Sequence, residues 1–177
     1  TIDKHTPVQV INLNSVVAIS AGGDGHSLAL KNDGTVWTWG NNGDGQIGDT
    51  AVHFITKPIQ VIGIDHVVAI AAGHGYSIAL KDDGTVWAWG YNTVGSLGDS
   101  TNNGRKKPVK VYGLYNIVSV NAGGGHSLAL RNDSTVWAWG NNNCGQLGDG
   151  TIANKNIPIL ITDLNNVVAI VTGDNHS

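Results

Sequence analysis

Apolar runs and short polar segments alternate along the chain in a set that returns about every 50 residues. In the first set, Pro7 to Val10 is a short run that opens with proline, and Val16 to Ile19 is continuously apolar and mostly β-branched. Two further runs, 26–31 and 35–40, flank Asn32-Asp33-Gly34. Asp-Gly between apolar runs favours a tight hairpin, and proline belongs at a strand beginning or edge. The pattern therefore predicts a unit of four β-strands, and no stretch shows the 3.6-residue period of a helix.

Tryptophan marks the repeat most clearly. The sequence Thr-Val-Trp-x-Trp-Gly occupies 35–40, 85–90 and 135–140, and these three copies hold all six tryptophans of the chain. Residues two apart on a strand point to the same side. We therefore expect the indoles to pack against the neighbouring unit, rather than to form a stacking surface for carbohydrate. These structural residues are Trp37, Trp39, Trp87, Trp89, Trp137 and Trp139.

Four-stranded units of this length are typical of propeller blades. The predicted fold is all-β: a single partial β-propeller over residues 1–177, with about three and a half four-stranded units. The repeats run 1–50, 51–100 and 101–150, and a half-repeat follows at 151–177, in which residues 167–170 are expected to form a strand.

The half-repeat leaves three interpretations open. The chain is a piece of a larger ring, or a homodimer closes the ring, or an exposed blade face packs on the next copy in a filament. In each case we expect the propeller to be completed by further sequence or by another chain.

One turn departs from the pattern. Ser134 replaces the glycine of Asp-Gly in the third copy. Because the favoured turn needs a positive φ, which strains serine, we expect a looser turn there.

Composition narrows the function classes. Charged residues make up 13% of the chain, about half the usual ~25%, and the net charge is −3. This balance argues against a nucleic-acid partner. No apolar run approaches the ~18 residues of a membrane span, so membrane insertion is not expected. The single cysteine, Cys144, excludes an intrachain disulfide and a cysteine-based zinc site.

Histidine recurs at one position of the repeat. His26, His126 and His176 are equivalent, and Tyr76 takes that place in the remaining copy. Successive blades would hold these side chains too far apart to share a metal ion. We expect each to make a hydrogen bond that anchors a turn, which the Tyr76 hydroxyl can also supply.

No other segment predicts a metal, a cofactor or catalysis. The stretch from Asn41 to Asp49 is similar to a calcium loop, but its copies carry Val94 and Cys144 in place of Asp44, so we interpret it as a turn between blades. Neighbouring His26 and Ser27 would point to opposite faces of a strand and cannot act as a base and nucleophile. We expect a protein that is not an enzyme.

The combined motifs resemble a known family. His-Ser-Leu-Ala-Leu at 26–30 and 126–130, and Tyr-Ser-Ile-Ala-Leu at 76–80, are each followed by Val-Trp-x-Trp-Gly and then by Gly-Asp. This combination resembles the regulator of chromosome condensation repeats. The resemblance implies a seven-bladed propeller that serves as a protein-binding platform. Members include an exchange factor for a small GTPase and secreted bacterial inhibitors of β-lactamases. The sequences of these repeats are similar to those of bacterial surface or secreted members.

The repeats differ most in segments 51–57, 101–107 and 151–157, which we interpret as loops that contact a partner. The predicted function is a non-enzymatic scaffold for protein–protein interaction or self-assembly, expected at the cell surface or outside the cell, with the cytoplasm as the alternative. Other candidates are an exchange factor, an enzyme inhibitor or a filament subunit. The predicted partner-binding residues are Phe54, Ile55, Lys57, Arg105, Lys106, Lys107, Asn154 and Lys155.

Overall fold

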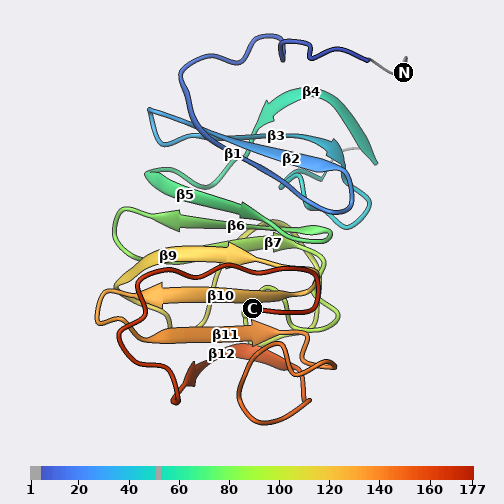
Figure 1. The fold of residues 1–177 in the computed structure, drawn as a ribbon. Helices are drawn as coiled ribbons and strands as arrows, with labels where there is room; N and C mark the ends of the chain where they lie inside the picture. Colours follow the sequence, from blue (N-terminus) through green and yellow to red (C-terminus); the bar gives the residue numbers. More distant parts are fainter. Residues whose placement is uncertain (1–4, 51–52) are drawn as a thin grey trace.

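The computed structural model describes residues 5–50 and 53–177, which form three four-stranded antiparallel sheets stacked in chain order (Figure 1). The first blade contains β1 (Val16–Ala21), β2 (His26–Lys31), β3 (Val36–Asn41) and β4 (Phe54–Gln60). The second contains β5 (Val67–Ala72), β6 (Tyr76–Lys81), β7 (Val86–Gly90) and β8 (Arg105–Lys110). The third contains β9 (Ile117–Ala122), β10 (His126–Arg131), β11 (Val136–Gly140) and β12 (Lys155–Ile161). The predicted all-β partial propeller is confirmed, and the described part of the chain contains no helix.

The blades are out of phase with the units expected from the sequence. The proline-containing strand β4 pairs with β3, as Trp37 opposite Gln60 shows, and so closes the blade before it. A blade therefore covers residues 16–60 rather than a four-strand unit within 1–50. The strand predicted at Pro7–Val10 is not formed. Its equivalents at Pro58 and Pro108 lie in β4 and β8, which pair with the third strand of the blade before them.

Each blade has the predicted hairpin between its second and third strands. In the first, Asp33 Oδ1 accepts hydrogen bonds from Thr35 N at 3.0 Å and from Thr35 Oγ1 at 2.6 Å. Ser134 adopts the expected positive φ of 66°. The looser turn expected there is not found, because Ser134 N donates to Arg131 O at 3.0 Å, as Gly34 N does to Lys31 O.

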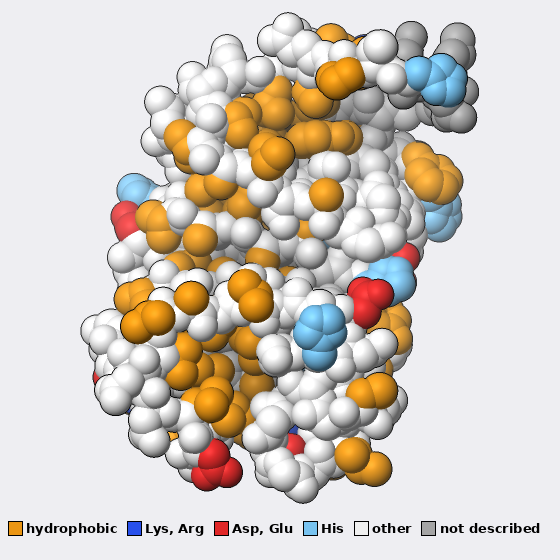
Figure 2. Space-filling model, in the orientation of Figure 1, with side chains coloured by type: hydrophobic (Ala, Val, Ile, Leu, Met, Phe, Trp, Pro, Cys, Tyr) orange, Lys and Arg blue, Asp and Glu red, His pale blue; other side chains and the backbone are white. Residues whose placement is uncertain are grey.

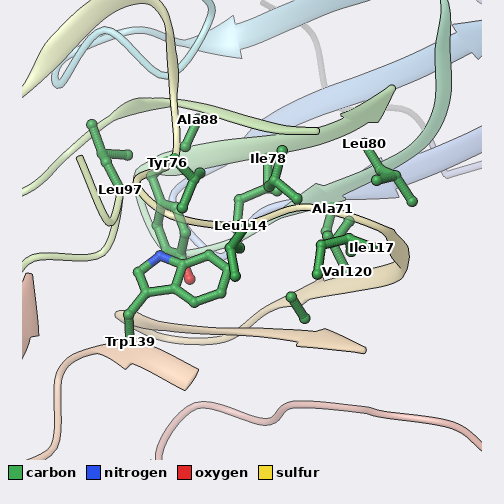
Figure 3. Close-up of a cluster of buried hydrophobic side chains, with 13 residues drawn as sticks. Ala71, Tyr76, Ile78, Leu80, Ala88, Leu97, Leu114, Ile117, Val120 and Trp139 are labelled. Carbon is green, nitrogen blue, oxygen red and sulfur yellow. The ribbon is translucent and has the colours of Figure 1, made fainter. Parts of the chain in front are cut away.

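The core lies between the blades. The first seam, between blades one and two, buries Leu28, Val36 and Trp89 among other residues. The second seam, between blades two and three, buries Tyr76, Ile78 and Trp139 in a cluster drawn in Figure 3. The first and second blades thus each cover one apolar side with the next blade, as expected of stacked repeats.

Residues 162–177 extend along the third blade (red in Figure 1). Val167 and Ile170 pack against the core of that blade. The strand predicted at 167–170 is not assigned, because in the described part of the chain no second strand pairs with it as β6 pairs with β5. Thr172 Oγ1 nevertheless holds the segment, donating to Asn121 Oδ1 at 2.7 Å.

Candidate interaction surface

One edge of all three blades carries the long connections. His26 pairs with Gly40, so the β1–β2 turn lies beside the end of β3 and the loop that follows it. The same pairing recurs in the other blades. We call this edge the long-loop face. It comprises the turns 22–25, 73–75 and 123–125, the loop residues 42–50, 53, 91–104 and 141–154, and the adjoining strand ends, which are Asn41 of β3 and the first three residues of β4, β8 and β12.

A buried asparagine braces the long loops. In the second blade, Asn92 Nδ2 donates to Thr101 O and Asn103 O, both at 3.0 Å, and Asn92 Oδ1 accepts from Leu97 N at 2.9 Å. Asn142 repeats the arrangement in the third blade. One amide therefore fixes both sides of a loop, which makes the loops a defined surface.

A charged pair closes each of two loops. Arg105 lies 2.7 Å from Asp99 Oδ2, and Lys155 Nζ lies 3.3 Å from Asp149 Oδ2. Burial tends to raise the pKa of Asp149, but hydrogen bonds from Thr151, Asn142 and Lys155 lower it to about 2. The pKa of Asp99 is also lowered: burial opposes the shift, and hydrogen bonds from Thr101 and Arg105 outweigh it.

These pairs change the interpretation of the predicted partner-binding residues. Arg105 and Lys155 are engaged within their own loops, and Asn154 Oδ1 accepts from Asn142 N at 2.7 Å. The sequence signal that was missed is an aspartate six residues before each cation.

The other five predicted residues lie at the start of outer strands. The expected loops 51–57, 101–107 and 151–157 run into β4, β8 and β12, so their later residues are not loop residues. Phe54 is 70% exposed at the first position of β4. The side chains of Lys57, Lys106 and Lys107 are exposed to solvent, whereas Ile55 is half-buried.

A polar hollow on the long-loop face was not foreseen. It has a volume of about 290 Å³ and is lined by side chains from all three blades, including Asp24, Asp44, His74, Tyr91 and Asn141. His74 Nε2 lies 2.7 Å from Asp24 Oδ1. A Cβ placed on Gly75 would lie 2.9 Å from Asp24 Oδ2 and 3.2 Å from Asp44 Oδ2, so both carboxylates face one point.

The recurrent histidine crosses the first seam instead of anchoring a turn. His26 Nε2 lies 3.1 Å from Ser77 Oγ, and Ser77 Oγ donates to Gln46 O at 2.9 Å. Because the serine proton goes to the carbonyl, His26 Nε2 is assigned as the donor. Burial lowers the pKa of His26 to about 4, although the Asp24 carboxylate and the Tyr76 backbone oppose the shift.

Tyr76 has the same role in the second seam. Its hydroxyl donates to His126 O at 2.5 Å, and Ser127 Oγ lies 3.1 Å from both that hydroxyl and Ser96 O. The Tyr76 hydroxyl does make a hydrogen bond, but the bond joins two blades, so the predicted role of anchoring a turn was wrong. His126 Nε2 reaches Ser177 Oγ at 3.0 Å, and His176 is exposed in the C-terminal segment.

Four indoles pack in the covered seams, as expected: Trp87 and Trp89 in the first, and Trp137 and Trp139 in the second. Trp89 and Trp139 are fully buried. Trp39, on the side of the first blade that no other blade covers, is half-buried beside a cavity of about 580 Å³. The other three, Trp37, Trp87 and Trp137, are half-buried below the cations Lys31, Lys81 and Arg131.

The stretch from Asn41 to Asp49 joins β3 to β4 within one blade, so its interpretation as a connection between blades was wrong.

Within residues 5–50 and 53–177, no group of three or more His, Cys, Asp or Glu side chains is placed to hold a metal ion. No helix that could span a membrane occurs in this same part.

Stacked four-stranded blades with short inner and long outer connections define the class: this is a partial β-propeller, with a covered seam between successive blades. The chain belongs to the regulator of chromosome condensation (RCC1) repeat family, whose model matches residues 33–80, 83–130 and 133–177. A second model of the same repeat matches residues 16–46, 67–96 and 117–146. Those matches begin at the first strand of each blade, in agreement with the observed phase.

Solved structures of longer proteins share this fold. Human WBSCR16 is 25% identical, with a TM-score of 0.81 over 90% of this chain and 42% of its own. Prp20p of Saccharomyces cerevisiae, described with its binding to Gsp1p and histones, is 26% identical, with a TM-score of 0.79 over 92% of this chain and 43% of its own. Yeast RCC1 (Prp20) bound to Kap60 is 27% identical, with a TM-score of 0.76 over 85% of this chain and 38% of its own. The chain thus spans less than half the length of these proteins.

Proposed function

We propose that this chain is a non-enzymatic scaffold that binds another protein through the long-loop face. The observation that carries the proposal is the position of the differences between repeats. On the opposite face the hairpin turns read Asn-Asp-Gly, Asp-Asp-Gly and Asn-Asp-Ser. On the long-loop face, equivalent positions differ in chemistry: Asn41, Tyr91 and Asn141 form one such set, and Asp44, Val94 and Cys144 another.

The side chains on this face suit protein recognition. Phe54 presents an exposed ring, Lys106 and Lys107 add positive charge, and the hollow at Asp24 and Asp44 adds negative charge. Aromatic anchors surrounded by polar groups are common at protein interfaces. The braced loops reduce the entropy lost on binding.

The proposal is tested with two matched triple variants. One changes the long-loop face, with Phe54→Ala, Tyr91→Ala and Lys107→Ala. The control changes the opposite edge, with Ile62→Ala, Tyr112→Ala and Lys110→Ala, where Ile62 and Tyr112 are 70% and 62% exposed. Immobilised wild-type chain and both variants are incubated with one cell extract, and retained proteins are quantified by mass spectrometry. We expect proteins that the wild type and the control variant retain and the long-loop variant loses. Equal retention by both variants would remove the assignment to this face.

Guanine-nucleotide exchange is the second candidate, favoured by the similarity to Prp20p, which binds Gsp1p. The measurement is the release rate of a fluorescent guanine nucleotide from Gsp1p with and without the chain. If a saturating concentration of this protein leaves the nucleotide release rate unchanged, this candidate is excluded and the scaffold proposal is unaffected. A location at the cell surface or outside the cell stays a prediction from the similarity of the repeat sequences to bacterial surface or secreted members.

A further inference from the structure

The sequence Asn-Asn-Gly occurs twice on the long-loop face, at 41–43 and at 102–104, and the fold treats the two copies in opposite ways. An asparagine that precedes glycine can lose its side-chain nitrogen without an enzyme, because the glycine amide nitrogen can attack the side-chain carbonyl carbon. Glycine favours this step, since it has no Cβ to obstruct the approach and the widest choice of backbone angles. With the same three residues in both copies, the surrounding structure decides whether Asn42 and Asn103 can react.

The first copy is held at both reacting groups. Asn42 is only 6% exposed. Its Nδ2 donates to Asp49 O at 3.3 Å, and its Oδ1 accepts from Ile47 N at 3.1 Å. The attacking group is engaged as well, because Gly43 N donates to Asn41 Oδ1 at 3.0 Å. The side chain of Asn42 therefore cannot turn toward Gly43 N without breaking buried hydrogen bonds.

The second copy is held only by its backbone. Asn103 N donates to Thr101 Oγ1 at 3.3 Å, and Asn103 O accepts from Asn92 Nδ2 at 3.0 Å. The side chain of Asn103 is exposed to solvent. Within residues 5–50 and 53–177, neither that side chain nor Gly104 N makes a hydrogen bond. Both reacting groups of this copy can therefore approach each other in the folded chain.

We propose that Asn103 is a site of spontaneous modification, at which the folded chain converts asparagine to aspartate and isoaspartate. Gly104 N bonds to Asn103 Cγ and gives up its proton, and the Cγ–Nδ2 bond breaks, so that ammonia leaves with that proton. Water then opens the cyclic imide, adding hydroxyl to a carbonyl carbon and a proton to Gly104 N. Opening at Cγ gives aspartate. Opening at the backbone carbonyl carbon gives isoaspartate, in which the chain continues through Cγ.

Conversion would change the long-loop face. Both products carry a carboxylate where the amide was neutral, two residues before Arg105. In isoaspartate the former backbone carbonyl, which accepts from Asn92 Nδ2, becomes that carboxylate. Figure 2 shows few charged side chains on the face of the molecule that it draws, and charged residues make up only 13% of the chain, so one added charge is a large local change. The proposal concerns the chemistry of the loop alone and does not depend on the proposed function.

The test follows both asparagines in the full chain. The folded chain is incubated in mildly alkaline buffer and digested, and the peptides that carry residues 42 and 103 are quantified by mass spectrometry, in which conversion of an amide to an acid raises the mass. Isoaspartate is identified by a protein isoaspartate methyltransferase with a labelled methyl donor. We expect Asn103 to convert at least about tenfold faster than Asn42, because Asn42 must first break two buried hydrogen bonds. In urea the two sites should convert within about threefold of each other, because the protection of Asn42 comes from the fold.

Two variants give the second arm. Asn103→Gln should abolish conversion at this position, because glutamine would have to close a larger ring that forms more slowly. The matched control is Asn143→Gln, at an exposed asparagine of the third long loop, which should leave conversion of Asn103 within about twofold of the wild type. Circular dichroism shows that each variant is folded. The proposal is overturned if Asn103 converts no faster than Asn42 in the folded chain, if the same difference persists in urea, or if folded Asn103→Gln releases as much ammonia as the wild type.

Discussion

The two covered seams share one packing plan but are joined by different side chains. In each seam a buried indole donates to the backbone carbonyl of residue 46 or 96, and a serine lies against the same carbonyl. His26 completes the first seam, and Tyr76 completes the second. The indole and the carbonyl thus carry the packing. The position held by His26 in one seam and Tyr76 in the other accepts either side chain. The side chain present there determines how each seam responds to acid.

The largest expected effect comes from removing the shared element. Trp89→Ala and Trp139→Ala should each lower the free energy of unfolding by about 3–5 kcal/mol, because both indoles are fully buried. Trp39→Ala, at a half-buried position, should cost well under half as much. Urea unfolding followed by circular dichroism measures all three. A cost for Trp39→Ala equal to the other two would show that burial in a covered seam is not what makes the indole important.

The second-largest expected effect is a loss of stability in acid, which should come mainly from His26 in the first seam. Folding lowers the pKa of His26 from 6.5 to about 4, chiefly by burial, so the unfolded chain binds this proton more readily. The stabilisation is complete above pH 6.5 and is lost as the pH falls toward 4, by about 3 kcal/mol at most. Urea unfolding between pH 7 and 4.5 measures the loss. Burial also lowers the pKa of His126, which adds to the loss in the same direction.

Converting the first seam to the chemistry of the second isolates the His26 contribution. His26→Tyr should retain stability at pH 7 and reduce the loss between pH 6.5 and 4, because tyrosine does not titrate in that range. The dependence that remains should come from His126 and, near pH 4, from carboxylates with a lowered pKa such as Asp99 and Asp149. An unchanged pH profile in folded His26→Tyr would show that His26 is not the acid-sensitive group.

Periodicity predicted the blades, the hairpin turns at Asp33 and its equivalents, and the packing of the indoles between units, because each depends on neighbours in one repeat. It did not predict where a blade begins. A 50-residue period has no marked origin, and Pro58 pairs with the strand before it rather than with those after it. The polar hollow was also missed, because Asp24, His74 and Asn141 come from three blades and meet only after stacking.

Removing the Tyr76 hydroxyl should lower the free energy of unfolding by less than the removal of a buried indole or the protonation of His26. Tyr76→Phe removes the donor to His126 O, which keeps its hydrogen bond from Gly123 N at 2.9 Å. The expected cost is about 1 kcal/mol, the usual net value of one hydrogen bond. Tyr115→Phe is the control, since Tyr115 is 58% exposed, and it should change the free energy of unfolding by much less. Equal losses in the two variants would show that the second seam does not depend on this bond.

The smallest expected effect concerns the hairpin turns at the seams. Val67 N donates to Gly34 O at 3.1 Å and Ile117 N to Gly84 O at 3.2 Å, but no corresponding bond from Val167 to Ser134 forms in the described part of the chain. A Cβ on Gly84 would lie 3.0 Å from Asn116 Cα, so a covered seam requires glycine there. Ser134→Gly should relieve the strain of a positive φ and raise the free energy of unfolding by up to about 1 kcal/mol. Gly84→Ser should lower it by more than Ser134→Gly raises it, because strain and crowding then act together. Thermal unfolding of both variants measures these changes. If the stability lost in Gly84→Ser equals the stability gained in Ser134→Gly, backbone strain alone, without crowding at the seam, sets the preference for glycine.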